Sequence, residues 1–238
     1  MRRYSPNPEL RAFQALIRNE VQRVGDLARG QGHVIYAIRD PSRRDLIRQH
    51  ADGPPVYVGR TKQLRIRAND HMRDGGGGST DTGCKTGRLK QILDKWQVPK
   101  FEILDTAPTH LTSLIAETIW ARRFIWLGYE LANQWAEHQT ASRPNGLETV
   151  PPDRLWDFTA AEAAEDEVRL VLECRRCRID AEVNLSGLEP NLKLNKVRSP
   201  SIACECCDGR FVPEVKLPDA GSWRWKDYSP AAMPPKGG

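Results

Sequence analysis

Apolar side chains recur at three- and four-residue spacing near the start of the chain. Residues 8–29 carry this stripe and Gly30 follows it, so the pattern predicts one amphipathic helix with a natural stop. We expect this helix to pack on the neighbouring domain; the alternative, an arm that grips nucleic acid, is suggested by Arg11, Arg18 and Arg29. The stripe consists of Leu10, Phe13, Ile17, Val21, Val24 and Ala28.

Two short runs rich in β-branched residues follow, near 33–38 and 55–59, and they are typical of strands. The segment between them holds the turn signals Asp40-Pro41 and Asp52-Gly53-Pro54-Pro55, so the two runs predict a hairpin with a long loop. Further regular elements are expected beyond the hairpin. They are helices at 64–73 and 86–96, a strand from Lys100 to Leu104, and a long helix from Thr112 as N-cap to Leu127, with Gly128 at its end.

The second half of the chain has a different pattern. Residues 141–167 predict a linker that ends in a short acidic helix from Thr159 to Glu167. Strand-like residues then flank two cysteine pairs within 168–228, and residues 229–238, rich in Pro, Gly and Ala, predict a disordered tail. We therefore expect an N-terminal helix in residues 1–30, a main domain in 31–140, and a small separate domain after the linker.

Charge is distributed unevenly over the 238 residues. Residues 1–150 carry 23 Lys and Arg against 16 Asp and Glu, a net of +7, whereas residues 151–238 carry 13 against 15, a net of −2. A positive face in the first part would attract a polyanion, and salt would weaken that binding. We find no secretion signal and no apolar run long enough to span a bilayer, so we expect a cytoplasmic protein without a membrane partner.

Two tyrosines on the predicted hairpin form the centre of a candidate active site. Tyr36 and Tyr57 lie on neighbouring strands, so both phenols could face the same side of the sheet. Arg67 and His71 are four residues apart in a predicted helix and therefore share one face. Glu117 lies in the long helix among apolar residues, where an acid needs a partner, and a metal ion is a suitable one.

These residues resemble the active site of the GIY-YIG nuclease family in content and spacing. Val56-Tyr57-Val58-Gly59 is similar to the family's second tyrosine motif, with Arg67 eight residues after the glycine and His71 four residues further on. Later in the chain, Glu117 and Asn133 match the family's helix glutamate and asparagine. The agreement of several residues in order makes coincidence a poor explanation, although each residue alone is unremarkable in a protein.

The resemblance covers roughly residues 32–135 and implies both a fold and a chemistry for them. The implied fold class is α+β, a small three-stranded antiparallel sheet flanked by helices. The implied activity is hydrolysis of phosphodiester bonds with one Mg²⁺ or Mn²⁺ ion held by Glu117. The chain departs from the family at Val34, which replaces the first glycine, and its long loop between the tyrosines is more like that of some restriction-enzyme members.

Phosphodiester hydrolysis calls for these residue types. Arg67 can form charge-assisted bonds to the phosphate, and a metal ion can neutralise the phosphate and stabilise the leaving oxygen. A tyrosine has a reference pKa of about 10, so neighbouring cations or hydrogen bonds would have to lower that pKa by about 2–3 units to make it a base. The resemblance implies a tyrosine general base; we favour Tyr36 relayed through His71, with Tyr57 as the rival, and expect Asn133 to orient its neighbours.

Other basic residues are expected to contact the substrate. Arg60 occupies a position where some family members have a lysine near the phosphate, and Lys62 follows it by two residues. The long loop supplies further donors. They are Arg39, Arg43, Arg44, Arg48 and His50.

Two paired cysteine motifs, separated by 26 residues, predict a metal site in the second half. Cys174 and Cys177 form the first pair, and Cys204 and Cys207 the second; Cys206 is an alternative fourth ligand, but Cys207 restores the two-residue spacing. Four thiolates make a closed tetrahedral zinc site, and in a reducing cytosol such pairs favour metal over disulfides. The module resembles a zinc ribbon, and it could be purely structural or could dock a target through Arg175, Arg176 and Arg178.

The sequence therefore predicts a metal-dependent endonuclease that acts on nucleic acid, which we expect to be DNA. A role in restriction or defence is the first expectation, and repair or mobile-element biology is the next. Two alternatives from other classes remain: a nucleic-acid-binding protein on an inactive nuclease scaffold, and a zinc-scaffolded protein-interaction module. One active site per chain would require a homodimer, a transient dimer or sequential nicks to break a duplex.

Overall fold

The computed structural model describes residues 7–77, 81, 83–133, 152–197, 204, 206–207 and 209–217. The predicted linker as far as residue 151 and the predicted tail at 229–238 lie outside this part of the chain. The described residues form two compact units, one of residues 7–108 and 116–133 and the other of residues 109–115 and 152–217. The beginning of the long helix thus groups with the second unit, whereas the sequence analysis placed the whole helix in the main domain.

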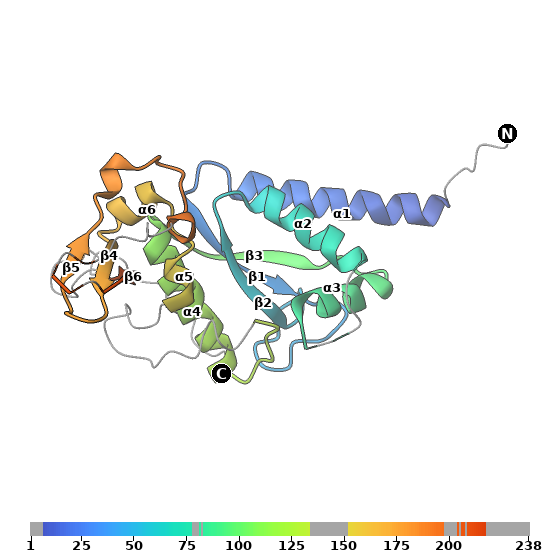
Figure 1. Cartoon of the computed structure of the whole chain (residues 1–238). Helices are drawn as coiled ribbons and strands as arrows, with labels where there is room; N and C mark the ends of the chain where they lie inside the picture. Colours follow the sequence, from blue (N-terminus) through green and yellow to red (C-terminus); the bar gives the residue numbers. More distant parts are fainter. Residues whose placement is uncertain are drawn as a thin grey trace. The chain divides into compact units, whose positions relative to one another are not determined.

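A three-stranded antiparallel sheet forms the centre of the first unit (Figure 1). Its strands are β1 (His33–Arg39), β2 (Pro55–Thr61) and β3 (Lys100–Ala107), in the order β2-β1-β3. The strands β2 and β3 are both antiparallel to β1, which lies in the middle and is buried along its whole length. The predicted α+β class and the predicted sheet are therefore confirmed.

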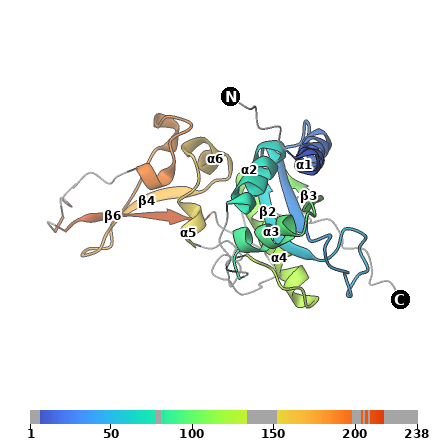
Figure 2. The same cartoon turned by 90° about the vertical axis from the view of Figure 1, so that its right-hand side faces the viewer.

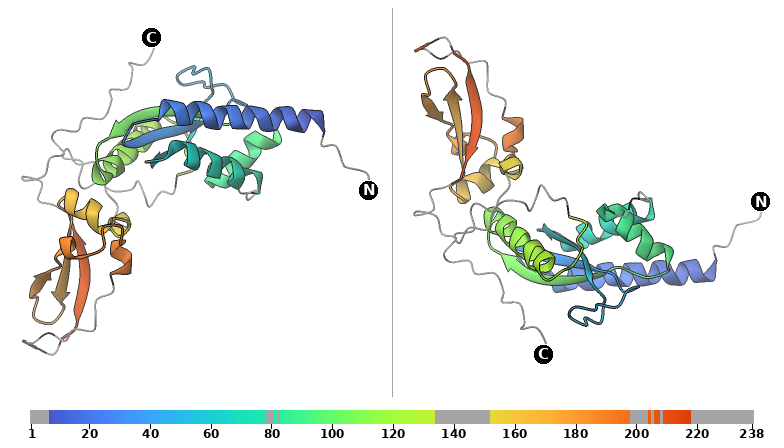
Figure 3. Two further views of the ribbon diagram at one scale, coloured as in Figure 1. Left: turned by 90° about the horizontal axis from the view of Figure 1, so that it is seen from above. Right: turned by 90° about the horizontal axis from the view of Figure 1, so that it is seen from below.

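Helices cover both faces of this sheet, α1 and α2 on one face and α4 on the other (Figure 3). Alternate side chains of β1 divide between the faces, because Val34, Tyr36 and Ile38 join the apolar core formed with α1, α2 and α3. The intervening Ile35 and Ala37 are equally buried and point the other way. The helices are α1 (Pro8–Leu27), α2 (Leu64–Gly76), α3 (Lys85–Asp94) and α4 (His110–Trp126).

The helix α4 begins two residues before the predicted N-cap. Thr109 and Thr112 exchange hydrogen bonds, since the Thr112 amide donates to Thr109 Oγ1 at 3.3 Å and the Thr109 amide donates to Thr112 Oγ1 at 3.0 Å. Thr109 therefore satisfies the free amide of the first turn, and the prediction of Thr112 as the cap is wrong by one turn. The predicted end at Gly128 is confirmed: its φ is 97°, and the Tyr129 amide donates back to the Phe124 carbonyl at 3.0 Å.

The long loop between β1 and β2 is held around one buried carboxylate. Asp45 accepts hydrogen bonds from the Tyr129 hydroxyl at 2.9 Å and from the Arg48 amide at 3.0 Å. Burial opposes its ionisation, but these hydrogen bonds keep the pKa of Asp45 below its ordinary value. Arg39, one of the expected nucleic-acid donors, is buried and pairs with Glu102 at 2.7 Å, so its guanidinium serves the fold instead.

The open edge of β2 is partly covered by the segment that follows α4. The Ala132 amide donates to the Val56 carbonyl at 2.7 Å, and the Asn133 side chain bonds both backbone groups of Val58, at 2.9 and 2.7 Å. An edge strand whose backbone is occupied in this way is held in register and protected from pairing with another chain. The covered stretch includes Tyr57, which lies between Val56 and Val58.

The second unit contains its own antiparallel sheet, in the order β5-β4-β6 (Figure 2). Before the sheet lies α6, which begins with a capping box in which the Thr159 and Glu162 side chains bond each other's backbone. The start of α4 packs beside α6, because the Leu111 amide donates to Asp166 Oδ2 at 2.8 Å. The elements are α5 (Pro152–Leu155), α6 (Ala160–Glu165), β4 (Arg169–Cys174), β5 (Asp180–Glu182), the 3-10 turns η3 (Leu185–Gly187) and η4 (Leu194–Lys196), and β6 (Phe211–Lys216).

None of the helices described combines the length and the apolar character needed to cross a bilayer.

Candidate functional site

The two tyrosines of the hairpin meet over a glycine. Tyr36 on β1 pairs in register with Gly59 on β2, and the rings of Tyr36 and Tyr57 lie with their centroids 6.5 Å apart. A Cβ atom on Gly59 would lie 2.6 Å from the Tyr36 hydroxyl and 2.8 Å from Cε1 of Tyr57. The glycine of the second tyrosine motif is therefore required for the two phenols to approach each other.

The helix α2 adds a guanidinium and an imidazole to the same face of the sheet. His71 Nε2 lies 2.7 Å from the Tyr36 hydroxyl, and Arg67, one turn earlier, is close enough to interact electrostatically with the phenols of both Tyr36 and Tyr57. The structure thus brings together these four residues, which are spread over 36 positions of the sequence. We call Tyr36, Tyr57, Arg67 and His71 the tyrosine cluster.

The cluster is not equally accessible at its two tyrosines. Tyr36 and His71 are fully buried, whereas Tyr57 and Arg67 are half-buried. Burial, with a smaller contribution from Tyr57, raises the pKa of Tyr36 well above its ordinary value, although Arg67 acts in the opposite direction. The sequence analysis expected cations to lower the pKa of the catalytic tyrosine; at Tyr36 burial outweighs them.

His71 is neutral at physiological pH. Burial, then the charges of Lys85 and Arg67, lower the pKa of His71 to about 3. Its Nδ1 atom is buried without a hydrogen-bond partner in the part of the chain that the structure describes. The hydrogen bond to Tyr36 is therefore the polar contact that orients this ring.

Glu117 lies on α4 with 4% of its surface exposed. Its Oε2 atom is 3.3 Å from Nε of Arg60, which pairs in register with Ile35 and so lies on the α4 side of the sheet. Glu117 is close enough to the tyrosine cluster to raise the pKa of Tyr36 through its charge. Arg60, expected near the phosphate, pairs with the candidate metal ligand.

The donor set around Glu117 fits Mg²⁺ only as a weakly held ion. Mg²⁺ is bound in proteins by one or two carboxylates, with water and substrate phosphate oxygens completing an octahedron. Glu117 supplies one buried carboxylate, and the guanidinium of Arg60 already neutralises part of the carboxylate's charge. Among the described residues, groups of three or more metal-ligating side chains occur elsewhere and not around Glu117. A substrate phosphate would therefore have to complete the coordination.

A surface depression of about 310 Å³ runs beside Arg67. Lys62 and Arg67 supply its positive charge, and Asp70 its negative charge. This places Lys62, an expected substrate-binding residue, next to the exposed side of the cluster. The lining consists of Thr61, Lys62, Gln63, Ile66, Arg67 and Asp70.

The remaining expected residues have other positions. Arg43 and Arg44 are exposed on the long loop and take no part in the hydrogen bonds of the tyrosine cluster, as far as the described residues show. Asn133 bonds the backbone of Val58 on the strand that carries Tyr57. These bonds fix the backbone next to Tyr57, and an orienting role of this kind is the one expected for Asn133.

One charged residue close to the cluster was missed by the sequence analysis. The Nζ atom of Lys85, the first residue of α3, lies 5.7 Å from the centroid of the Tyr57 ring. Lys85 follows a glycine-rich stretch with no periodic or motif signal, so only the packing of α3 against β2 reveals it.

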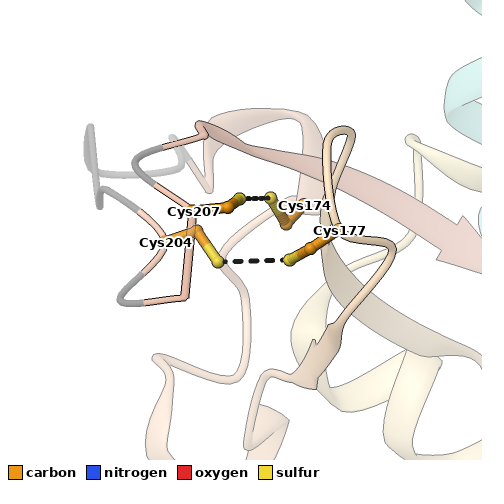
Figure 4. A group of neighbouring side chains, drawn as sticks. All are labelled: Cys174, Cys177, Cys204 and Cys207. Atoms are coloured by element: carbon orange, nitrogen blue, oxygen red, sulfur yellow. Dashed lines mark hydrogen bonds between the residues drawn. The ribbon is translucent and has the colours of Figure 1, made fainter.

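The second unit brings four cysteines together, as the spacing predicted (Figure 4). Cys174 Sγ lies 3.4 Å from Cys207 Sγ, Cys177 Sγ lies 3.4 Å from Cys204 Sγ, and all four sulfur atoms lie within 4.8 Å of one another. With Zn–S bonds of about 2.3 Å, the edges of a tetrahedral site are about 3.8 Å, so these sulfur atoms could hold one zinc ion.

The two cysteine turns have the same backbone closure. The Cys174 amide donates to the Ile179 carbonyl at 2.9 Å, and the Cys204 amide donates to the Gly209 carbonyl at 2.7 Å, each five residues ahead. A Cβ atom on Gly209 would lie 2.9 Å from Cys174 Sγ, so this glycine lets the turns meet. Backbone hydrogen bonds, first that of Cys177, lower the pKa of Cys174 to about 6, whereas the neighbouring thiols raise the pKa of Cys177 and of Cys207.

The ambiguity over the fourth ligand is settled in favour of Cys207, because Cys206 is exposed and outside the sulfur cluster. The arginines of the first turn are largely engaged within the module. Arg176 donates to the Cys207 carbonyl at 2.9 Å, and Arg178 pairs with Glu173 at 2.7 Å. These contacts favour the structural role over target docking through this turn.

Comparison of the chain with protein-family models, with curated proteins and with solved structures found no match in any of the three.

Proposed function

We propose that this chain is a metal-dependent endonuclease of the GIY-YIG type that hydrolyses phosphodiester bonds in nucleic acid, most readily in DNA. The observation that carries the proposal is the tyrosine cluster, in which Tyr36 bonds His71 and the charge of Arg67 acts on both phenols. The Arg67 guanidinium lies close to two phenols and lines a surface depression together with Lys62, an arrangement that suits a phosphate better than a neutral ligand. The net charge of +7 in residues 1–150 supports a polyanionic substrate.

The half-buried Tyr57 is the better general base of the two tyrosines. A base must come within hydrogen-bond reach of the water it activates, and Tyr36 is fully buried. Arg67 favours the ionised form of either phenol, because its positive charge acts on both, and its exposed side can also hold the phosphate. Tyr36 and His71 then serve to position Arg67 and Tyr57, which revises the order of preference reached from the sequence.

Glu117 is the residue that would hold the divalent ion. When bound together with the substrate phosphate, Mg²⁺ or Mn²⁺ would supply charge neutralisation at the phosphate and at the leaving oxygen. The ion pair with Arg60 orients the carboxylate before any substrate arrives.

Cleavage of a supercoiled plasmid and of matched DNA and RNA oligonucleotides tests the proposal. With Mg²⁺ or Mn²⁺ we expect nicked or linear product, no product with EDTA, and no product from Glu117→Gln. Asp94→Asn is the matched control, because Asp94 is an exposed carboxylate on α3 that pairs only with Lys90 among the described contacts; this variant should cut as the unmodified chain does.

Other results would favour the alternatives. Binding of nucleic acid without cleavage, under all metal conditions, would support a nucleic-acid-binding protein on an inactive scaffold. The absence of both binding and cleavage would refute the proposal. If nicked plasmid accumulates before linear plasmid at low protein concentration, and linear plasmid forms without a nicked intermediate at high protein concentration, two copies act together on a duplex. Protection of cells against foreign DNA by the unmodified chain, and not by Glu117→Gln, would support a role in restriction or defence.

For the second unit we propose one structural zinc ion held by Cys174, Cys177, Cys204 and Cys207. The sulfur separations and the paired backbone closures support this. Zinc would replace part of an apolar core in a unit whose sheet has two partly or fully exposed strands, β5 and β6.

A further inference from the structure

Lys85 places a second cation at the tyrosine cluster, close to the ring of Tyr57. Its side chain is half-buried and its ammonium lies over the Tyr57 ring at 5.7 Å from the centroid. Burial and the charge of Arg67 lower the pKa of Lys85, and the charge of Lys85 in turn helps to lower the pKa of His71. The electrostatic field of this lysine therefore reaches into the cluster.

The charges around Tyr57 come from three packed elements. The helix α2 contributes Arg67 and the neutral His71, with Asp70 and Asp74 near the lysine; α3 contributes Lys85; and β1 contributes the neutral Tyr36. The first turn of α3 adds the positive end of a helix dipole close to Lys85. The two acids offset the charge of the lysine in part, because both raise its pKa.

Two like charges held close together destabilise a protein unless a negative charge forms between them. Arg67 and Lys85 both lie close to Tyr57, and a phenolate there is a negative charge that both cations stabilise. A cation at about 6 Å changes the pKa of a neighbouring group by about half a unit at the dielectric constant of water and by about two units at the effective dielectric constant of a protein surface, so about one unit is expected at a half-buried tyrosine. Lys85 is thus placed to favour ionisation of the Tyr57 phenol, whereas burial opposes ionisation of the Tyr36 phenol.

We infer that Lys85 is a positioning residue that favours the ionised form of Tyr57 and so prepares it as the general base. This inference rests on the proposed nuclease function for its role in catalysis. The Tyr57 phenolate takes one proton from the attacking water, and the oxygen of that water forms the new bond to phosphorus. The bond from phosphorus to the leaving oxygen breaks, and the leaving oxygen takes a proton from solvent.

Titration of Tyr57 in the full chain without nucleic acid tests the inference independently of activity. The protein is labelled with ¹³Cζ-tyrosine, the Tyr57 signal is assigned with Tyr57→Phe, and its chemical shift is followed as the pH is raised. We expect Lys85→Met to raise the pKa of Tyr57 by about one unit. Lys85→Arg should restore it, since a guanidinium stays charged over the whole range.

Lys90→Met is the matched control, because Lys90 lies on the same helix and pairs with Asp94 at 3.0 Å. This variant should leave the Tyr57 titration unchanged. An unchanged Tyr57 pKa in Lys85→Met, with the Tyr36 signal still in its native position, would overturn the inference. An equal rise in Lys90→Met would also overturn it, because the effect would then be one of general net charge.

Single-turnover cleavage at saturating protein gives the catalytic readout. The alkaline rise of the rate against pH should move upward in Lys85→Met by the same amount as the NMR titration, and Lys85→Arg should move it back. If the unmodified chain cleaves and Lys85→Met keeps its pH profile, the inference fails and the proposed function stands. If the unmodified chain cleaves nothing, the proposed function fails, and the NMR titration still decides whether Lys85 controls Tyr57.

Discussion

Burial of His71 makes the first unit sensitive to acid, and the effect can be sized from the structure. The ring is fully buried, and its pKa falls from 6.5 to about 3. In the unfolded chain the same imidazole takes up a proton below about pH 6.5. Between these two values only the unfolded state is protonated, so stability is complete above about pH 7 and falls as the pH drops towards 3.

The loss should reach about 2 kcal/mol at pH 5 relative to pH 8. It is the free energy of protonating an unfolded histidine 1.5 pH units below its reference pKa of about 6.5, at about 1.4 kcal/mol per unit. His71→Gln removes the titrating group and keeps an amide that can bond the Tyr36 hydroxyl. We expect this variant to lose about 2 kcal/mol less than the unmodified chain over the same pH interval, whatever its stability at pH 8.

Native-state hydrogen exchange of the β1 amides in the full chain measures this, after correction for the intrinsic pH dependence of exchange. The strand β1 is buried along its length and carries Tyr36, the partner of His71. His50→Gln is the comparison variant, because His50 accepts a hydrogen bond from the Asp52 amide in the long loop; it separates the loss of a histidine elsewhere from the loss of His71. Equal slopes in the unmodified chain and His71→Gln would refute the claim that burial keeps this imidazole neutral.

Three further predictions concern the zinc site, the tyrosine motif and the long loop. Elemental analysis should find about one zinc per chain, lost in Cys174→Ser and kept in Cys206→Ser, since only the first sulfur belongs to the cluster. In urea unfolding, Gly59→Ala should lose about 1–3 kcal/mol in the free energy of unfolding, because its Cβ would meet both phenols. Gly76→Ala, whose Cβ would have no heavy atom within 4 Å, should leave the free energy of unfolding unchanged. Asp45→Ala should lose about 1–3 kcal/mol in urea unfolding and speed proteolysis within the long loop, because Tyr129 and the Arg48 amide lose their acceptor; proteolysis at the unmodified rate would contradict this.

Local signals carried most of the fold. The apolar stripe of α1, the β-branched runs of β1 and β2, and the glycine after α4 are each readable over a few residues, because helix and strand periodicity and positive-φ positions depend on nearby sequence. Spacing likewise brought out the cysteine pairs, because two ligands on one tight turn must be close in sequence. The start of α4 was misplaced since Thr109 and Thr112 are both good caps, and only their hydrogen bonds distinguish them.

By itself the sequence determined which residues could form the tyrosine cluster and the sulfur cluster, through their order and spacing. Tertiary structure alone decided that Tyr36 and His71 are buried while Tyr57 is half-buried, that Arg60 holds Glu117, and that Lys85 stands over the ring. The physical reason is that ionisation depends on desolvation and on charges a few ångströms away, which come from strands and helices distant in the chain. The sequence motif identifies the ionisable side chains, and their packing determines which of these side chains can be ionised.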